Sequence, residues 1–137
     1  MRRIMFGILA VAICTLVGCE KEVKNDPYYV LTVVGTVVDE AGEPIQGIHA
    51  HPEGGDFQGR DGYTDYQGKF GGNSYLAPRN KWVIVFEDVD GEYNGGEYES
   101  LTIDITSKVT PPRAPDEWGF SGSGYVEMGT IVLKKKM

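Results

Sequence analysis

Apolar and polar side chains alternate with a period of two over most of the chain after residue 27. The clearest example is the stretch 101–106, where Leu, Ile and Ile alternate with Thr, Asp and Thr. This period places successive side chains on opposite faces, as in a half-buried strand. Similar stretches lie at 29–38, 48–50, 69–70, 81–87 and 125–133. No segment after Cys19 has helical periodicity, so the sequence predicts an all-β sandwich of about six or seven short strands.

The strand expected at 29–38 is apolar on both faces, which is typical of a strand covered on both sides. One face carries Tyr29, Leu31, Val33 and Val37, and the other carries Val30, Val34 and Val38. We expect the core to include Phe70, Trp82 and Phe86. The stretch 107–124 is rich in Pro and Gly and is expected to be a long irregular loop, either functional or disordered.

The first nineteen residues have a different pattern. Arg2 and Arg3 precede a nearly unbroken apolar run, 4–17, which has the length of a secretory signal core and is too short to span a bilayer. The run ends in Leu-Val-Gly-Cys at 16–19, which resembles a bacterial lipobox, where a peptidase cuts before the Cys and acyl chains such as palmitate are attached. We therefore expect a lipidated Cys19 on an extracytoplasmic protein.

This pattern divides the chain into three parts. Residues 1–18 are the expected signal peptide, which forms a helix, and 19–28 are the lipidated Cys and a polar tether. Residues 29–137 form the expected β-sandwich. Because the two Cys of the chain are Cys14 and Cys19, this domain has no disulfide and is stabilised by apolar packing alone.

Charge excludes one class of partner. The chain has 13 basic and 20 acidic residues, and loss of Arg2 and Arg3 would leave 11 basic residues and a net charge of −9. An acidic surface repels nucleic acid, so no nucleic-acid partner is expected. Attachment to the membrane is expected through the N-terminal lipid.

Two stretches resemble a known family. They are residues 35–48 (GTVVDEAGEPIQGI) and 64–70 (TDYQGKF). In this order they resemble the carboxypeptidase regulatory-like domain, a transthyretin-like β-sandwich. Gly42 and Gly68 would permit a positive φ, and Pro44 would fix φ where the chain turns back. The resemblance implies an accessory fold that stiffens, spaces or docks, with the peptidase chemistry in another domain.

A narrower resemblance covers most of the rest of the chain. Residues 86–92 (FEDVDGE), 95–97 (GGE) and 129–136 (GTIVLKKK) look like a group of Bacteroidota lipoproteins that occur beside a radical-SAM protein. This resemblance implies a place in the cell envelope, at the outer membrane or cell surface. It also implies a radical-SAM maturase as a partner, and it implies no reaction.

The segment 88–99 is a candidate calcium site. Oxygen ligands stand close together on a Gly-rich loop, as calcium requires: Asp88, Asp90, Glu92, Asn94 and Glu97. The loop is not an EF-hand, because counting from Asp90 puts Leu101 at the twelfth position, where an EF-hand has Glu. The alternative is a solvated acidic hairpin. Apart from calcium, no cofactor is expected.

A second candidate is the pair His49 and His51. Two His two residues apart on a strand share a face and can chelate zinc or copper. A third ligand would come from elsewhere, with Glu53 or Asp56 as the nearest carboxylates. The alternative is that both rings face solvent, because Ile48 and Ala50 take the core face.

Candidate catalytic residues do not form a convincing set, so the protein is not expected to be an enzyme. Residues 119–123 (GFSGS) nearly match a nucleophile elbow, but Ser stands at the last position and no strand–turn–helix context surrounds it. Asp56, Asp61 and Asp65 are typical turn formers, and Asp65 is expected to accept hydrogen bonds from turn backbone.

Trp118 and Phe120 are the candidate partner-binding residues, because aromatic side chains on a loop grip a protein or a sugar. The alternative is that they pin the loop onto the sandwich. Together, these features predict a lipid-anchored envelope protein whose β-sandwich acts as a binding, docking or structural module. The partner would be an envelope protein or, for a glycan-binding accessory module, a glycan.

Overall fold

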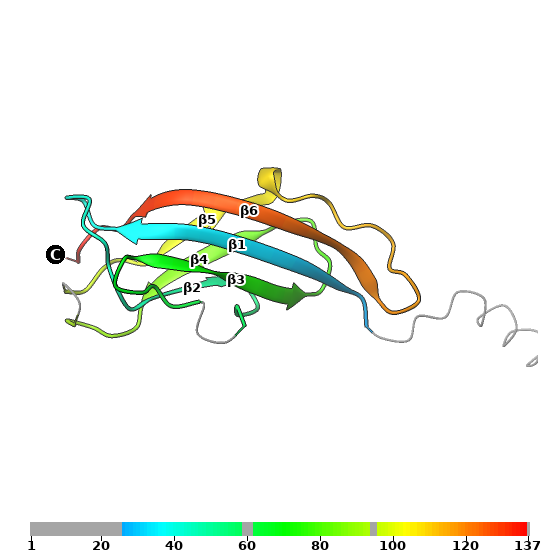
Figure 1. Cartoon of the computed structure of the whole chain (residues 1–137), viewed down its shortest axis with the longest axis horizontal. Coiled ribbons are helices and arrows are strands. Elements are labelled where there is room, and N and C mark those ends of the chain that lie inside the picture. The colour runs from blue at the N-terminus through cyan, green and yellow to red at the C-terminus, as the bar shows by residue number, and fades with distance from the viewer. Residues whose placement is uncertain (1–25, 59–61, 94–95, 137) are drawn as a thin grey trace, which may run out of the picture.

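The computed structural model describes residues 26–58, 62–93 and 96–136, and the expected signal peptide and the lipidation site lie outside them. The described residues form six strands and one short 3-10 helix (Figure 1). The strands are β1 (Tyr28–Val38), β2 (Ile48–Pro52), β3 (Lys69–Leu76), β4 (Val83–Asp88), β5 (Leu101–Asp104) and β6 (Phe120–Val132), and the helix is η1 (Thr106–Lys108). The prediction of an all-β fold is confirmed.

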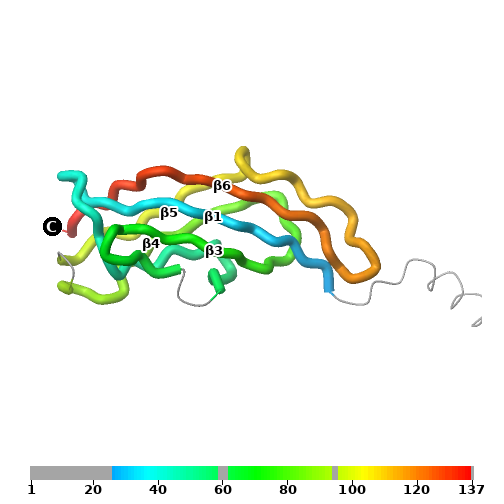
Figure 2. Tube along the Cα trace, viewed as in Figure 1, coloured from blue at the N-terminus to red at the C-terminus, as the bar shows by residue number. Residues whose placement is uncertain are grey.

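The strands make two three-stranded sheets, with the orders β3-β1-β6 and β2-β4-β5. The long strand β1 pairs antiparallel with β3 and parallel with β6, and these strands run along the long axis of the molecule (Figure 2). In the other sheet, β4 pairs antiparallel with both neighbours. The C-terminal end lies at the opposite end of the molecule from the start of β1 (Figure 2).

Both sheets contribute to one hydrophobic core. Tyr29, Leu31 and Val33 of β1 are completely buried, and the Phe70 ring of β3 meets the Phe86 ring of β4 edge to face at 5.4 Å. Trp82 is also buried, so the three predicted core aromatics are confirmed. The apolar inner faces of the two sheets cover each other, which removes both from water.

The prediction that β1 is covered on both sides is wrong for Val30 and Val34, whereas Val38 at the end of the strand is buried. Val30 and Val34 point away from the core and are only half-buried, because no third layer covers this sheet among the described residues. Their neighbours across the sheet give partial cover: Val30 lies opposite Tyr75 of β3, and Val34 lies opposite Glu127 of β6. The outer face of sheet β3-β1-β6 is therefore open to solvent, and it mixes apolar side chains with polar ones such as Thr32, Asn73 and Glu127.

The expected irregular loop 107–124 is shorter in the structure, because β6 begins at Phe120. Residues 120–124 pair with the start of β1, and after Phe120 they are all Ser or Gly. The rest of the segment is held by η1, by buried Val109, and by a hydrogen bond of 2.7 Å that the Tyr29 hydroxyl donates to the Thr110 carbonyl.

Three tight turns share one construction, with an Asp three residues before a Gly: 39–42, 65–68 and 116–119. In each turn one carboxylate oxygen accepts hydrogen bonds from the backbone N–H two and four residues later, at 2.8–3.0 Å. The Gly has a positive φ of 86°, 76° or 94°. The predictions for Gly42, Gly68 and Asp65 are thus confirmed.

Candidate functional site

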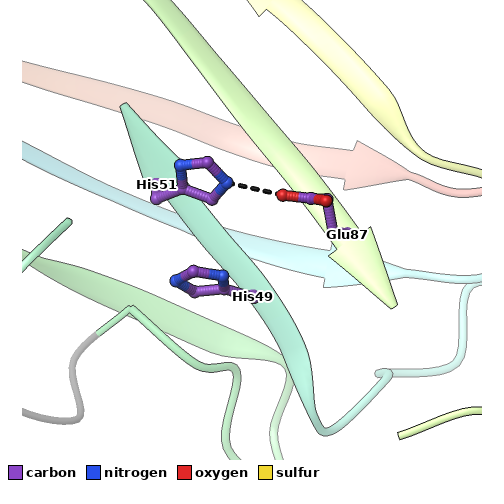
Figure 3. A group of neighbouring side chains, drawn as sticks. All are labelled: His49, His51 and Glu87. Carbon is purple, nitrogen blue, oxygen red and sulfur yellow. Dashed lines mark hydrogen bonds and ion pairs between the residues drawn. The ribbon is translucent and has the colours of Figure 1, made fainter. Parts of the chain in front are cut away.

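Strands β2 and β4 bring two His and one Glu together on the outer face of their sheet (Figure 3). Ile48 and Ala50 of β2 are buried, so the period of two turns His49 and His51 to the other face. In the antiparallel register His49 lies directly opposite Glu87 of β4. Glu87 therefore reaches His51 on the diagonal, a distance that long side chains span.

The three side chains form a close group. His51 Nε2 lies 2.6 Å from Glu87 Oε1, and the two imidazole rings stack with their centroids 4.5 Å apart. One ligand atom from each of the three residues lies within 4.8 Å of the other two. The side chains of His49 and His51 are 19% and 18% exposed, and that of Glu87 is 46% exposed. The group is thus partly shielded, yet water or an ion can reach it.

Hydrogen bonding fixes the orientation of the His51 ring. Its Nδ1–H donates to the Pro52 carbonyl over 3.1 Å, since a carbonyl oxygen can only accept, and Nε2 then faces Glu87. Burial lowers the pKa of His51, but the hydrogen bonds to Glu87 and Pro52 and the charges of Glu87 and Asp56 outweigh it. The pKa of His51 is consequently raised above its ordinary value.

A second carboxylate and an aromatic ring hold His49. Asp56 Oδ1 lies 3.0 Å from His49 Nε2, and the backbone carbonyl of Asp56 accepts a hydrogen bond of 2.8 Å from the Ser74 hydroxyl. The ring of Tyr63 stacks on His49 with centroids 4.5 Å apart and planes 12° from parallel. These contacts restrict rotation of the His49 ring.

Sequence reasoning found the two His but missed Glu87. Asp56, one of the two carboxylates considered as a third ligand, contacts His49, whereas Glu53 is not part of the group. The sequence carried one signal for Glu87. It is polar and alternates with buried Ile84 and Phe86, so it had to lie on the outer face of its strand.

In the acidic loop 88–99, the first carboxylate, that of Asp88, accepts hydrogen bonds from the backbone. Asp88 Oδ1 and Oδ2 accept hydrogen bonds from the backbone N–H groups of Asp90 and Tyr98, at 3.1 and 2.9 Å. Glu97 lies 3.5 Å from Lys136 Nζ, Glu92 is exposed, and Asn94 lies outside the described residues. Among the described residues, no three carboxylates of this loop converge as the His group does. Calcium binding there stays a prediction.

Aromatic side chains gather on the outer face of sheet β3-β1-β6, near the start of β1. We name Tyr28, Tyr75, Phe120 and Tyr125 the aromatic face. The Tyr28 ring meets the rings of Tyr75 and Phe120 with centroids 5.9 and 5.7 Å apart, and Tyr125 pairs with Thr32 in the register of β6 on β1. Tyr75 and Tyr125 are 56% and 61% exposed. The aromatic face is therefore open to a partner.

One of the two predicted partner-binding residues, Phe120, belongs to this face. Phe120 is half-buried under Arg113, whose guanidinium lies 5.1 Å from the ring centroid. Trp118, two residues earlier in the turn 116–119, is 52% exposed. The loop is pinned by buried Val109 and by the Tyr29–Thr110 hydrogen bond.

A groove of about 430 Å³ continues the same sheet face toward the end of β1. Its walls include Val34 and Phe70, with Lys69 and Glu127 as the charged side chains.

Ser121, the central residue of the near-match to a nucleophile elbow, lies inside β6 and is completely buried. Its hydroxyl therefore has no route to a substrate in this structure.

No protein-family model matches the chain, and no curated protein matches it. The resemblance to the carboxypeptidase regulatory-like domain thus rests on the two motifs alone. Within residues 26–58, 62–93 and 96–136, no helix is long and apolar enough to cross a membrane.

Proposed function

We propose that the protein is a lipid-anchored, extracytoplasmic module of the carboxypeptidase regulatory-like (transthyretin-like) class that binds another envelope protein and catalyses no reaction. The observation that carries the proposal is the exposed aromatic face. Tyr, Trp and Arg are enriched among the residues that carry most of the binding energy in protein interfaces. Here Tyr75 and Tyr125 are exposed on the aromatic face, Arg113 lies over Phe120, and Trp118 is exposed in the turn before β6.

The position of the aromatic face suits an anchored protein. Tyr28 is the first residue of β1, and only residues 20–27 separate it from Cys19. Eight extended residues reach at most about 28 Å. The lipid anchor would hold the aromatic face close to the membrane, at the outer membrane or the cell surface. There the aromatic face would meet other envelope proteins.

The two-sheet fold supports the proposed class. The Gly residues of the two family-like motifs, Gly42 and Gly68, both adopt a positive φ, and Pro44 bridges back to Val38. These are the roles that the resemblance assigns to them. The narrower resemblance adds a radical-SAM maturase as a second candidate partner, separate from the envelope protein.

Two experiments in the producing cell test the proposal. The anchor arm tests the lipid on Cys19, and the surface arm tests partner binding at the aromatic face. In the anchor arm, Cys19→Ala should move the protein from the membrane fraction to the soluble fraction and abolish acyl labelling. The matched control is Cys14→Ala, which should change neither property, because Cys14 lies in the expected signal peptide. Unchanged fractionation of the Cys19 variant would contradict the anchor.

In the surface arm, photoreactive p-benzoyl-phenylalanine replaces Tyr75 or Tyr125, and exposed Tyr66 outside the aromatic face is the control. Both face positions should give the same discrete protein adduct in intact cells, and position 66 should give none. Adding Tyr125→Lys should remove the adduct formed from position 75. Equal adducts from all three positions, or none from the face, would refute the proposal. Adducts with polysaccharide would assign the face to a glycan.

A further inference from the structure

The group of His49, His51 and Glu87 has the chemistry of a transition-metal site. Two imidazole nitrogens and one carboxylate oxygen are the donors that zinc and copper take in proteins. Calcium and magnesium prefer sets made of oxygen alone. The donors come from two adjacent strands of one sheet, so their backbone positions are fixed by the β2–β4 pairing.

We propose that His49, His51 and Glu87 bind one zinc or copper ion on the outer face of sheet β2-β4-β5. Ligand atoms on a tetrahedral zinc lie about 2.0–2.2 Å from the ion, and thus roughly 3.3–3.5 Å from one another. The three ligand atoms already lie within 4.8 Å of each other. Because the two rings are stacked, rotations about the side-chain bonds would turn the ligand atoms toward one ion, while the β2–β4 pairing holds the backbone in place.

Neighbouring residues orient both imidazole rings in a way that suits metal binding. Binding requires a free lone pair on the coordinating nitrogen, and the Pro52 carbonyl keeps the His51 proton on Nδ1, which leaves Nε2 for the metal. Asp56 beside His49 would orient that ring, as outer carboxylates do in many metal sites. The Tyr63 ring covers one side of His49 and limits access of water.

Three protein ligands leave at least one coordination position for water or for a further donor. The half-exposed Glu87 side chain keeps that position open to solvent. The site lies on the opposite side of the molecule from the aromatic face, because each occupies the outer face of a different sheet. Metal binding is therefore independent of the proposed partner binding.

Equilibrium dialysis tests the site directly. The full chain, purified in detergent with a tag that contains no His and stripped with chelator, is dialysed against buffered Zn²⁺, and bound metal is measured by mass spectrometry. Wild type should bind one zinc per chain. His51→Gln should abolish that binding, and Glu87→Gln should weaken it by at least the roughly 10–100-fold that loss of an outer carboxylate costs, because Glu87 contacts the ion itself. Cu²⁺ should displace the zinc, since it binds such donors more tightly.

The matched control is Glu53→Gln, which removes an exposed carboxylate near β2 but outside the group, and its zinc affinity should equal that of wild type. Circular dichroism and thermal melting in chelator establish that each variant is folded. Glu87→Gln keeps the size of the side chain, so it tests the site even if a His variant does not fold. Two results would overturn the proposal: no stoichiometric zinc on wild type, or equal zinc on the Glu87 variant.

Discussion

At the scale of single residues, two buried serines of the same sheet differ in their hydrogen bonding. Ser74 of β3 is 1% exposed and donates to the Asp56 carbonyl over 2.8 Å. Ser121 of β6 is completely buried, and its hydroxyl has no hydrogen-bond partner among the residues that the structure describes. A buried hydroxyl that lacks a partner keeps the cost of its desolvation without a compensating bond.

The two serines should therefore respond differently to truncation. Ser74→Ala should lower the free energy of unfolding by about 0.5–1.5 kcal/mol, because it removes a satisfied hydrogen bond. Ser121→Ala should leave that free energy within about 0.5 kcal/mol of wild type, or raise it. Urea denaturation followed by circular dichroism measures both values. If Ser121→Ala costs as much as Ser74→Ala, then the Ser121 hydroxyl has a partner in solution.

At the scale of elements, the Asp-x-x-Gly turns define where the strands begin and end. The turn 65–68 leads directly into β3, and the turn 116–119 leads directly into β6. In both, the carboxylate accepts the N–H of the first strand residue, Lys69 or Phe120. The same turn therefore also fixes Trp118 and Phe120 at the edge of the aromatic face.

Two glycines of these turns make a matched pair for mutation. Gly68 has a φ of +76°, and a Cβ there would lie 2.4 Å from the Val37 carbonyl oxygen. Gly42 has a similar φ of +86°, but a Cβ there meets no atom within 4 Å. Gly42→Ala should cost about 1 kcal/mol of stability from backbone strain alone.

Gly68→Ala should cost more than Gly42→Ala, by about 1 kcal/mol or more, because the added methyl group must also displace backbone of β1. Thermal melting of the two variants provides the comparison. Equal losses would show that the turn 65–68 moves away from β1 without cost. Such a result would contradict the tight packing of this motif against Val37.

At the scale of the whole molecule, Tyr29 joins three parts of the fold. It belongs to β1, its ring lies 4.7 Å from the Trp82 ring at the edge of the other sheet, and its hydroxyl bonds to Thr110 of the long loop. Burial raises the pKa of the Tyr29 phenol above its ordinary value. The folded protein thus holds this proton more tightly than the unfolded chain does.

This linkage predicts a loss of stability in alkali. The contribution of Tyr29 is fully present below the unfolded pKa of about 10 and is lost as pH rises through the higher folded pKa. Tyr29→Phe should cost about 0.5–1.5 kcal/mol at pH 7, where it removes the bond to Thr110. Above pH 10 the stability gap between wild type and variant should narrow.

Urea denaturation across this pH range, followed by the fluorescence of Trp82 and Trp118, measures the effect. Burial also raises the pKa of Tyr98. The Tyr29→Phe variant should therefore still lose some stability as the pH rises. A stability gap that stays constant from pH 7 to pH 11 would contradict a buried, hydrogen-bonded phenol at position 29.

The candidate sites show which contacts could be predicted from the sequence and which could not. His49 and His51 are two residues apart on a strand, so their common face follows from the chain itself. Glu87 lies 36 residues beyond His51, and only the pairing of β2 with β4 brings the two together. The aromatic face likewise draws on β1, β3 and β6, of which only the part around Trp118 and Phe120 was predicted.

Local sequence pattern was enough to predict the all-β class, the approximate positions of the strands, the turns 39–42 and 65–68, and the aromatic core. These features depend on local period and backbone preference, which neighbouring residues settle. The tertiary structure decided which apolar face of β1 is buried, that β6 lies parallel to β1, and which carboxylate meets the two His. The physical reason is that these outcomes depend on contacts between distant segments, which local period leaves open.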